Sequence, residues 1–255
     1  MQLNDLSALV VHVRPYRESS AMVQFFTREQ GRLTGVMKGL HRGRRQQLVQ
    51  PFQLGSLSCR GGSGLLTVTS FDTSQRIRLD GDKLSAGFYV LELISRSLVE
   101  RQIETGVFDA TVRALVSLSE ASQTRGLAEC LRRFESVLLS QLGYGLDFLH
   151  EGRSGVPIQA ERFYRLIDEQ GFVLADEVDG CDTIEPSLPQ QQVKSQHHSN
   201  SALIPGYILL SIASGAIAEP SVGRILKNLN QQALLPLIGS APLISRSMYL
   251  AKARG

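Results

Sequence analysis

The hydrophobic pattern of the chain changes its period once, close to Asp82, and this change limits the folds that the chain can adopt. Before it, apolar and β-branched residues come in short runs separated by loop residues, as in β-strands. After it, apolar residues recur at about every three and a half positions, the spacing of an amphipathic helix. The sequence therefore predicts an α+β protein in which the strands come first and the helices follow.

Five short strands are expected in residues 1–80. They are Leu6–Val13, Met22–Thr27, Arg32–Lys38, Phe52–Cys59 and Leu65–Phe71. The intervening segments contain the proline, serine and glycine residues that favour loops, and Gly31 can supply the positive φ of a turn after Arg28. Five short strands within one small region favour an antiparallel barrel, and the OB-fold has this number of strands.

Residues 81–255 are expected to form a helical domain, with an excursion at about 150–201. Helices are predicted at 84–99, 107–118, 127–142, 202–214, 220–235 and 242–253. Within the excursion, Arg162–Glu177 has the pattern of a β-hairpin, and the polar residues 182–201 are expected to form a mobile loop. We thus expect an OB-fold domain at 1–80 and an all-helical domain at 81–255 with an inserted hairpin.

Charge is distributed unevenly along the chain. The net charge is +3 overall, but residues 1–80 carry +6, whereas residues 81–255 carry −3. Residues 151–185 hold three basic and nine acidic side chains, and residues 186–255 hold six basic and one acidic. A basic first part, an acidic middle and a basic end suggest surfaces that bind different partners.

Hydropathy and cysteine content predict a soluble cytoplasmic protein, located at the nucleoid if it binds DNA. No apolar run reaches the length of about 18 residues that a membrane helix needs, and no signal peptide is evident. The three cysteines, Cys59, Cys130 and Cys181, are odd in number and far apart, which argues against a disulfide framework.

The stretch Gly31–Arg45 ends in a basic loop, and no acidic residue lies between Glu29 and Asp72. Such a run attracts phosphate, because each neutralised phosphate releases a condensed counterion. A solvated turn with no ligand is the alternative. The candidate DNA-binding residues are Arg14, Arg32, Lys38, Arg42, Arg44 and Arg45.

Aromatic residues of the predicted barrel offer a second possible contact with single strands, through stacking on the bases. The candidates are Tyr16, Phe25, Phe26 and Phe52. The alternative is that they form the core of the barrel, and we expect this for at least two of the three phenylalanines.

Several segments, taken in order, resemble the RecO family of bacterial recombination mediators. In the barrel they are Val13–Ser20 (VRPYRESS), Phe26–Arg32 (FTREQGR), Lys38-Gly39 and Gln50–Phe52 (QPF). In the helical part they are Leu131–Glu135 (LRRFE), Leu142–Gly145 (LGYG), Leu234–Gly239 (LLPLIG), Pro242-Leu243 and Ser245-Arg246. The similarity covers most of the chain and is weakest at residues 150–205.

This resemblance implies both a fold and a set of partners. The fold is an N-terminal OB-fold followed by a helical domain. The implied activity is binding of single- and double-stranded DNA, annealing of complementary strands and assistance in loading the RecA recombinase. The implied partners are RecR and the acidic C-terminal tail of the single-stranded-DNA-binding protein, SSB.

The LRRFE segment suggests where the SSB tail would bind. The tail ends in an apolar residue with a free carboxylate, and arginine pairs with a carboxylate as a fork. Arg132 and Arg133 are the candidate tail-binding residues, with Arg132 as the first choice. The alternative is that both arginines only pair with Glu129 or Glu135 on the same helix.

One departure from the family concerns a metal. Many relatives carry a four-cysteine zinc site after the third helix, whereas this chain reads Asp147–Arg153 (DFLHEGR) there and has no pair of closely spaced cysteines. Zinc needs about four ligands at close spacing. Neither Cys181 nor the His197-His198 pair supplies them, so we predict no metal and no cofactor.

No set of catalytic residues is evident in the sequence. The nucleotide-binding pattern with a glycine loop and a following lysine is absent, and Gly61–Gly64 fits a hairpin turn. Acidic residues at 176–185 could gather a metal for nuclease chemistry, but no periodicity brings them together. We therefore expect a DNA-binding protein without enzymatic activity. A metal-dependent nuclease and a generic OB-fold binder without mediator activity are the alternatives.

Overall fold

The computed structural model describes residues 2–38, 49–62, 64–175 and 202–245. The chain divides into two compact units. Unit 1 comprises Met1–Tyr144 and Ala233–Gly255, and unit 2 comprises Gly145–Gln232. Among the described residues, no helix is long and apolar enough to cross a membrane.

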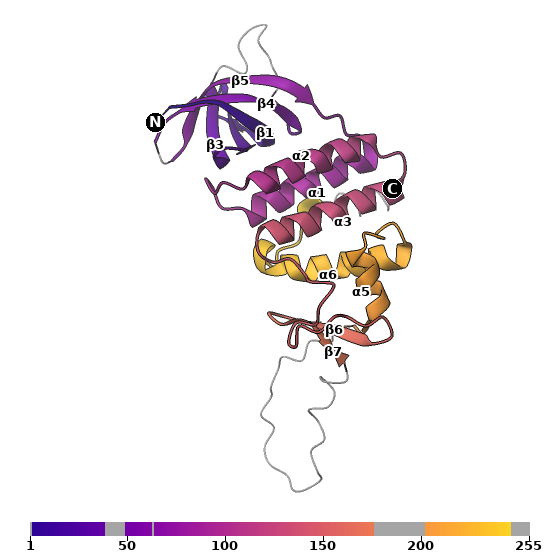
Figure 1. Cartoon of the computed structure of the whole chain (residues 1–255). Coiled ribbons are helices and arrows are strands. Elements are labelled where there is room, and N and C mark those ends of the chain that lie inside the picture. Colours follow the sequence, from indigo (N-terminus) through magenta and orange to yellow (C-terminus); the bar gives the residue numbers. More distant parts are fainter. Residues whose placement is uncertain (1, 39–48, 63, 176–201, 246–255) are drawn as a thin grey trace, which may run out of the picture. The chain divides into compact units, whose positions relative to one another are not determined.

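Unit 1 begins with a closed five-stranded barrel (Figure 1). Its strands are β1 (Gln2–Tyr16), β2 (Ser20–Thr27), β3 (Gly31–Lys38), β4 (Gln53–Arg60) and β5 (Leu66–Arg76). They follow the order β1-β2-β3-β5-β4, and the β3–β5 pair is parallel. The predicted OB-like barrel is confirmed, with β1 and β5 longer than their hydrophobic runs suggested.

The inside of the barrel is filled by apolar side chains that alternate with polar ones along the strands. Val10, Val23, Phe25 and Leu33 point inward and are buried, and the Phe25 ring meets that of Phe71 at a centroid distance of 5.4 Å. Because side chains of a strand alternate between two faces, the residues between these core positions point away from the barrel.

Three helices follow the barrel: α1 (Gly81–Ser97), α2 (Thr105–Glu120) and α3 (Thr124–Gln141). One hydrophobic core extends from the outside of the barrel into these helices. The Phe26 ring lies 5.4 Å from that of Phe108 on α2, and the Phe52 ring lies 5.0 Å from that of Phe88 on α1. The barrel and these helices therefore lie in one compact unit, which divides from the next after Tyr144. The domain boundary expected at residue 80 stays a prediction.

The connection between α1 and α2 fills the edge of β3 that β5 leaves uncovered. β5 pairs with β3 only at Gly35 and Val36, and nearer the start of β3 the backbone N–H of Arg101 donates to the carbonyl of Arg32 at 2.9 Å. Thr34 Oγ1 also donates to the Glu100 carboxylate at 2.5 Å. The barrel and the helices are thus joined by backbone pairing as well as by a shared core.

Residues 241–245 are fixed to α1 by Glu92 and Arg96. The Glu92 carboxylate accepts hydrogen bonds from the backbone N–H groups of Ile244 and Ser245, both at 2.9 Å, and Arg96 donates to the carbonyls of Ala241 and Pro242. Burial would raise the pKa of Glu92, but the hydrogen bonds from Ser245 and Ile244 and the charge of Arg96 outweigh it and hold the pKa low.

Unit 2 contains a small sheet, one short helix and the first part of a longer helix. Strands β6 (Phe163–Ile167), β7 (Gly171–Leu174) and β8 (Ile204–Pro205) form a sheet in the order β7-β6-β8. They are followed by α5 (Gly206–Ala213) and α6 (Pro220–Ile238), and α6 continues into unit 1. The predicted hairpin is confirmed, and Glu169 and Gly171 in its turn have φ of 63° and 80°.

One predicted helix differs from the structure, and another lies mostly outside the described residues. The helix expected at 202–214 begins only at Gly206, because Ile204 and Pro205 pair with β6 instead. The helix expected at 242–253 can be followed only to Ser245, because residues 246–255 lie outside the described part. The polar segment 182–201, expected to be a mobile loop, also lies outside it.

The contact between β3 and the α1–α2 connection is possible because residue 31 is a glycine, which has no Cβ. Gly31 has φ of 65°, and a Cβ there would lie only 1.9 Å from the carbonyl oxygen of Gln102. We expect Gly31→Ala to lower the free energy of unfolding by about 2–4 kcal/mol, from overpacking and positive φ together. Urea denaturation followed by circular dichroism would measure this change.

Gly64→Ala is the matched control, because a Cβ at Gly64 would have no atom within 4 Å. Its stability should stay close to that of the parent chain. Equal stability of the two variants would contradict the tight seating of the connection on β3.

Candidate nucleic-acid interface

The outer face of β1, β2 and β3 presents three rows of side chains, set by the register of the strands. One row contains His12, Gln24 and Thr34, the next Arg14, Met22 and Val36, and the last Tyr16, Ser20 and Lys38. Neighbouring strands lie about 4.8 Å apart, so each row spans roughly 10 Å. In OB-folds this face and the loops beside it bind oligonucleotides.

Arg14 and Lys38 lie at the same end of this face. The Arg14 guanidinium contacts the sulfur of Met22, with Nη2 2.8 Å from Sδ, so the side chain lies along the sheet. Lys38 is exposed one row further on. Arg42, Arg44 and Arg45 lie outside the described residues, although they follow Lys38 closely in the sequence.

Arg32 is at the other end of β3, six positions or roughly 20 Å from Lys38. Its guanidinium donates to the carbonyl oxygens of Ser95 at 2.7 Å and Leu98 at 2.5 Å, at the carboxyl end of α1. Burial lowers its pKa. A cation at this end of a helix is favourable for the helix dipole. The predicted phosphate contact of Arg32 stays a prediction, and the geometry favours a structural role.

The four aromatic candidates for stacking differ in their exposure to solvent. Phe25, Phe26 and Phe52 are 1%, 0% and 6% exposed, so all three belong to the core, where we expected at least two. Tyr16 lies on the outer face, in the same row as Lys38. Of the four candidates for stacking, Tyr16 alone has its ring at the surface.

Sequence reasoning missed Arg17, which lies in the turn between β1 and β2. Its guanidinium carbon is 5.2 Å from the centroid of the Tyr16 ring, a cation–π contact, and its φ is 55°. The available signal was the adjacent Tyr-Arg pair in a loop joining two strands, which places a cation beside an exposed ring.

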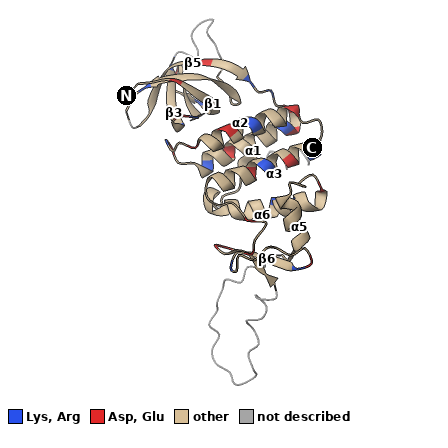
Figure 2. Ribbon diagram, viewed as in Figure 1, with Lys and Arg blue, Asp and Glu red and all other residues tan. Residues whose placement is uncertain are grey.

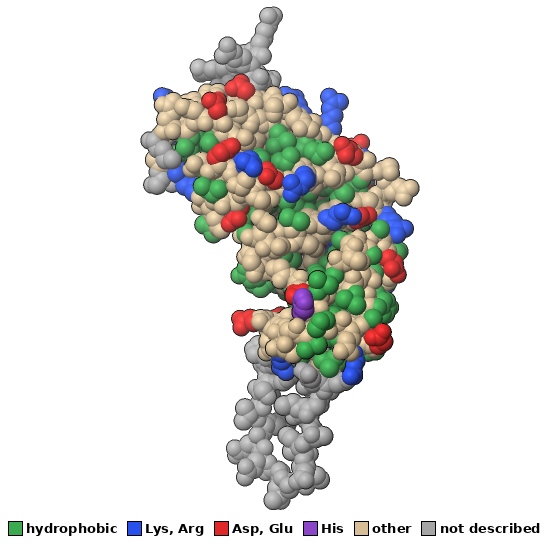
Figure 3. Space-filling view, viewed as in Figure 1, with side chains coloured by type: hydrophobic (Ala, Val, Ile, Leu, Met, Phe, Trp, Pro, Cys, Tyr) green, Lys and Arg blue, Asp and Glu red, His purple; other side chains and the backbone are tan. Residues whose placement is uncertain are grey.

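Elsewhere on unit 1, charges of both signs are mixed. Figure 2 shows lysine and arginine interspersed with aspartate and glutamate along α1, α2 and α3, and Figure 3 shows the same on the surface that faces the viewer. Some of these charges are paired, as in the bond of 3.0 Å between Arg28 and Asp109. This surface therefore lacks the single sign that a phosphate-binding face needs.

The two arginines of α3 have different environments. Arg132 is 8% exposed and lies 2.7 Å from the carboxylate of Glu135, which is fully buried and also accepts a hydrogen bond from the Tyr89 hydroxyl. Arg133 is 62% exposed and lies 2.7 Å from Glu129. Both arginines thus form the ion pairs with Glu135 and Glu129 that the alternative to tail binding expects. A role of either arginine in tail binding stays a prediction.

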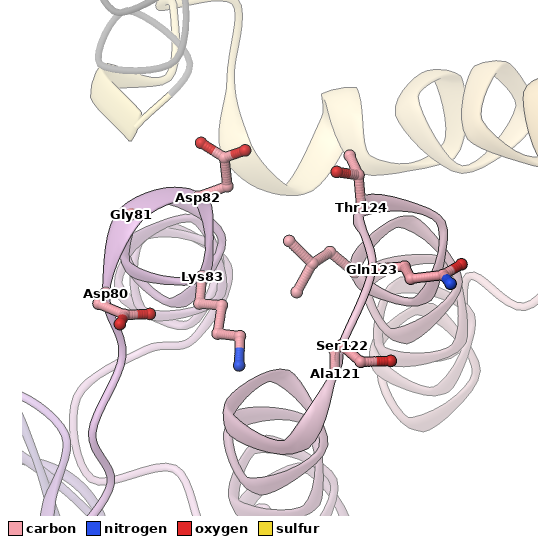
Figure 4. A pocket seen from close by; sticks show the side chains of 9 residues that line it. Asp80, Gly81, Asp82, Lys83, Ala121, Ser122, Gln123 and Thr124 are labelled. Carbon is pink, nitrogen blue, oxygen red and sulfur yellow. The ribbon is translucent and has the colours of Figure 1, made fainter.

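A hollow of about 350 Å³ lies where the start of α1 meets the turn between α2 and α3 (Figure 4). It is lined by Asp80–Lys83, Ala121–Thr124 and Leu127. Asp80 and Asp82 bring negative charge, and Lys83 donates its ammonium to the carbonyl of Ser119 at 2.8 Å. This arrangement offers neither a nucleophile with a base nor a site suited to phosphate.

The segment that follows α3 is held by carboxylates. Asp147 accepts hydrogen bonds from the N–H groups of Leu149 and His150, and the buried Glu151 accepts two from Ser154, both at 2.5 Å. Within the ranges that the structure describes, no group of three or more His, Cys, Asp or Glu side chains could hold a metal ion. Cys181, His197 and His198 lie outside those ranges.

These features define a class of protein: an OB-like barrel joined to a helical domain, with cations and one aromatic ring on the outer face of the barrel. Two family models match the chain, "Recombination protein O N terminal" over residues 1–76 and "Recombination protein O C terminal" over residues 78–183.

Curated relatives agree with this class over almost the whole chain. The DNA repair protein RecO of Cellvibrio japonicus is 34% identical, covering 98% of both chains. That of Stutzerimonas stutzeri is 36% identical over 95% of this chain and 92% of its own, and that of Proteus mirabilis 34% over 95% and 90%. The chain belongs to the RecO family, whose members are recombination mediators and not enzymes.

The turn of residues 147–158 should depend on an ionised Glu151. Burial would raise the pKa of Glu151, but the hydrogen bonds from Ser154 and the charge of Arg153 outweigh it and hold that pKa low. We expect Glu151→Gln to lower the free energy of local opening of this turn by roughly 1–3 kcal/mol at pH 7. Hydrogen exchange of residues 149–158 would measure it.

The effect should disappear in acid. A carboxylate with a lowered pKa contributes stability above its unfolded pKa of about 4.3, and loses it as the pH falls through the folded value. The variant and the parent chain should therefore converge as the pH falls below the folded pKa of Glu151. Glu161→Gln, a change at an exposed position of the same unit, is the control. It should not alter the free energy of local opening, either at pH 7 or in acid. A difference between variant and parent that is constant with pH would contradict this account.

Proposed function

We propose that this protein mediates homologous recombination and DNA repair by binding single- and double-stranded DNA and annealing complementary strands coated with SSB. It also assists RecA loading together with RecR, without a metal or cofactor. The observation that carries the proposal is the family match over nearly the whole length of the chain. The cations and the aromatic ring on the outer face of the barrel support it.

The barrel holds the DNA backbone at the end of the face that carries Arg14, Arg17 and Lys38. Arg42, Arg44 and Arg45, which follow Lys38 in the sequence, are the further candidate phosphate contacts. Two strands held against the same basic surface repel each other less, which favours their pairing. Because phosphate contacts carry no sequence information, the protein should bind with little sequence preference.

The helical part receives the acidic tail of SSB through an arginine of α3. Arg132 remains our first candidate, because Glu135 holds its guanidinium in a fixed orientation next to the apolar core. A terminal carboxylate with an apolar side chain requires this combination of a fork and a nonpolar surface. Arg133 projects into solvent, where a single ion pair contributes little.

A generic OB-fold binder without mediator activity is the alternative function. It would bind DNA through the same outer face but would ignore SSB. The nuclease alternative is less well supported, because the family is not enzymatic. The acidic residues 176–185, on which it rested, lie outside the described residues.

DNA binding should depend on salt through the basic loop. Lys38, Arg42, Arg44 and Arg45 together should contribute roughly −3 to the slope of log affinity against log salt concentration on a single strand. Replacing Lys38, Arg42, Arg44 and Arg45 with alanine should make this slope markedly less steep, as measured by fluorescence anisotropy between low and moderate salt. Alanine at Arg113 on α2 and at Arg224 on α6, two exposed positions outside the barrel, should leave the slope unchanged. An unaltered slope in the fourfold variant would rule out the loop as the contact.

Annealing should depend on the SSB tail. Two complementary oligonucleotides coated with the cognate SSB should pair faster in the presence of this protein, and the stimulation should vanish when the SSB lacks its tail. DNA binding without stimulation would favour the generic binder.

Binding of a peptide with the sequence of the SSB tail can locate the tail contact. Arg132→Lys keeps a charge beside Glu135 but removes the fork, so it should weaken binding of a tail peptide roughly tenfold and leave binding of naked DNA intact. Arg133→Lys is the matched control. Loss of tail binding in the control alone would move the site to Arg133.

A further inference from the structure

Tyr16 differs from every other aromatic residue of the barrel region. Residues 1–80 contain five aromatic residues, and the phenylalanines at 25, 26, 52 and 71 are 1%, 0%, 6% and 5% exposed. Tyr16 is half-buried, at the last position of β1, and belongs to the outer face. The core of the barrel therefore does not account for Tyr16.

The surroundings of Tyr16 combine a ring with cations at a short spacing. Arg17 lies over the ring at 5.2 Å, and Lys38 lies two strands away in the same row, with Ser20 between them. Arg14 lies two positions earlier on β1, on the same face. A ring beside cations is suited to binding one unpaired nucleotide. The base offers a flat apolar surface to the ring, and the phosphates beside it can contact the cations.

We propose that Tyr16 is a stacking platform for one unpaired base and that it gives the barrel a preference for single-stranded over double-stranded DNA. The inference rests on DNA binding by the barrel as proposed above, and adds the residue that distinguishes the two substrates. In a duplex both faces of a base are covered by its neighbours, so the ring finds no partner. The cations contact the phosphates of either substrate.

Arg17 keeps the ring in place in the absence of DNA. Its guanidinium lies over the face of the ring, and an incoming base takes that position. The displaced guanidinium remains within reach of the phosphate beside that base. Arg17 thus contributes one phosphate contact on single strands, while the ring contributes the stacking.

This arrangement gives annealing a direction. A single strand is held by both stacking and phosphate contacts. Once its bases have paired with a complementary strand, the stack on Tyr16 is lost and only the phosphate contacts remain. The duplex is therefore held less tightly than the strands that formed it, which favours its release.

The chain provides an optical signal for the test, because it has six tyrosines and no tryptophan. Stacking of a base on Tyr16 should quench tyrosine emission, after correction for absorption by the DNA. The experiment titrates the full-length protein and its Tyr16→Leu and Tyr16→Phe variants with an oligothymidylate and with a mixed-sequence duplex of equal length, and measures anisotropy and tyrosine emission together.

We expect Tyr16→Leu to bind the single strand about tenfold more weakly and to lose most of the quenching, while its affinity for the duplex stays the same. Tyr16→Phe should bind both substrates like the parent chain, because stacking needs the ring and not the hydroxyl. Tyr144→Leu and Tyr207→Leu are the controls, since both tyrosines are exposed and lie outside the barrel.

The outcomes separate this inference from the proposed function. Unchanged single-strand binding by Tyr16→Leu would overturn the inference and leave DNA binding by the barrel intact. An equal loss on single strand and duplex would also overturn it, because the ring would then not distinguish them. Failure of the parent chain to bind any DNA would refute the proposed function itself.

Discussion

The seating of the α1–α2 connection on β3 is the interaction on which the rest of unit 1 depends. At the start of β3, Gly31 leaves room for the backbone of Gln102, the carbonyl of Arg32 accepts from Arg101, and the guanidinium of Arg32 binds the end of α1. These contacts use one end of the strand to join the barrel to the helices. The other end, with Lys38, is left to face solvent next to Arg14 and Tyr16. The position of the candidate nucleic-acid interface therefore follows from how the two parts of unit 1 are joined.

Local pattern was enough to predict most of the secondary structure, because the period of apolar residues records which side of an element is buried. The five strands, the first three helices and the hairpin all follow from it. The short strand β8 does not, because only two of its residues pair with β6, and their apolar sequence continues into α5. A strand of that length is defined by its partner across the sheet and has no pattern of its own.

The roles of individual arginines were harder to predict, because a role depends on contacts distant in the sequence. Arg32 lies in a basic stretch with Lys38, but its partners are carbonyls more than sixty positions later. Arg132 and Arg133 are neighbours in the sequence, yet successive residues of a helix point about 100° apart. One of them is therefore buried beside Glu135 and the other lies in solvent. A buried ion pair of this kind contributes little to stability, but it does hold a side chain in one orientation.

Charge alone cannot tell a single strand from a duplex, since both present phosphates at regular intervals. A protein that anneals strands needs a contact that exists before pairing and is lost after it. Exposed base surface is the chemical difference between the two states, and an aromatic ring is the side chain that responds to it. On this barrel the phenylalanines are committed to the core, and one tyrosine lies among the cations of the outer face. The packing that buries the phenylalanines thus leaves a single ring able to detect whether a base is paired.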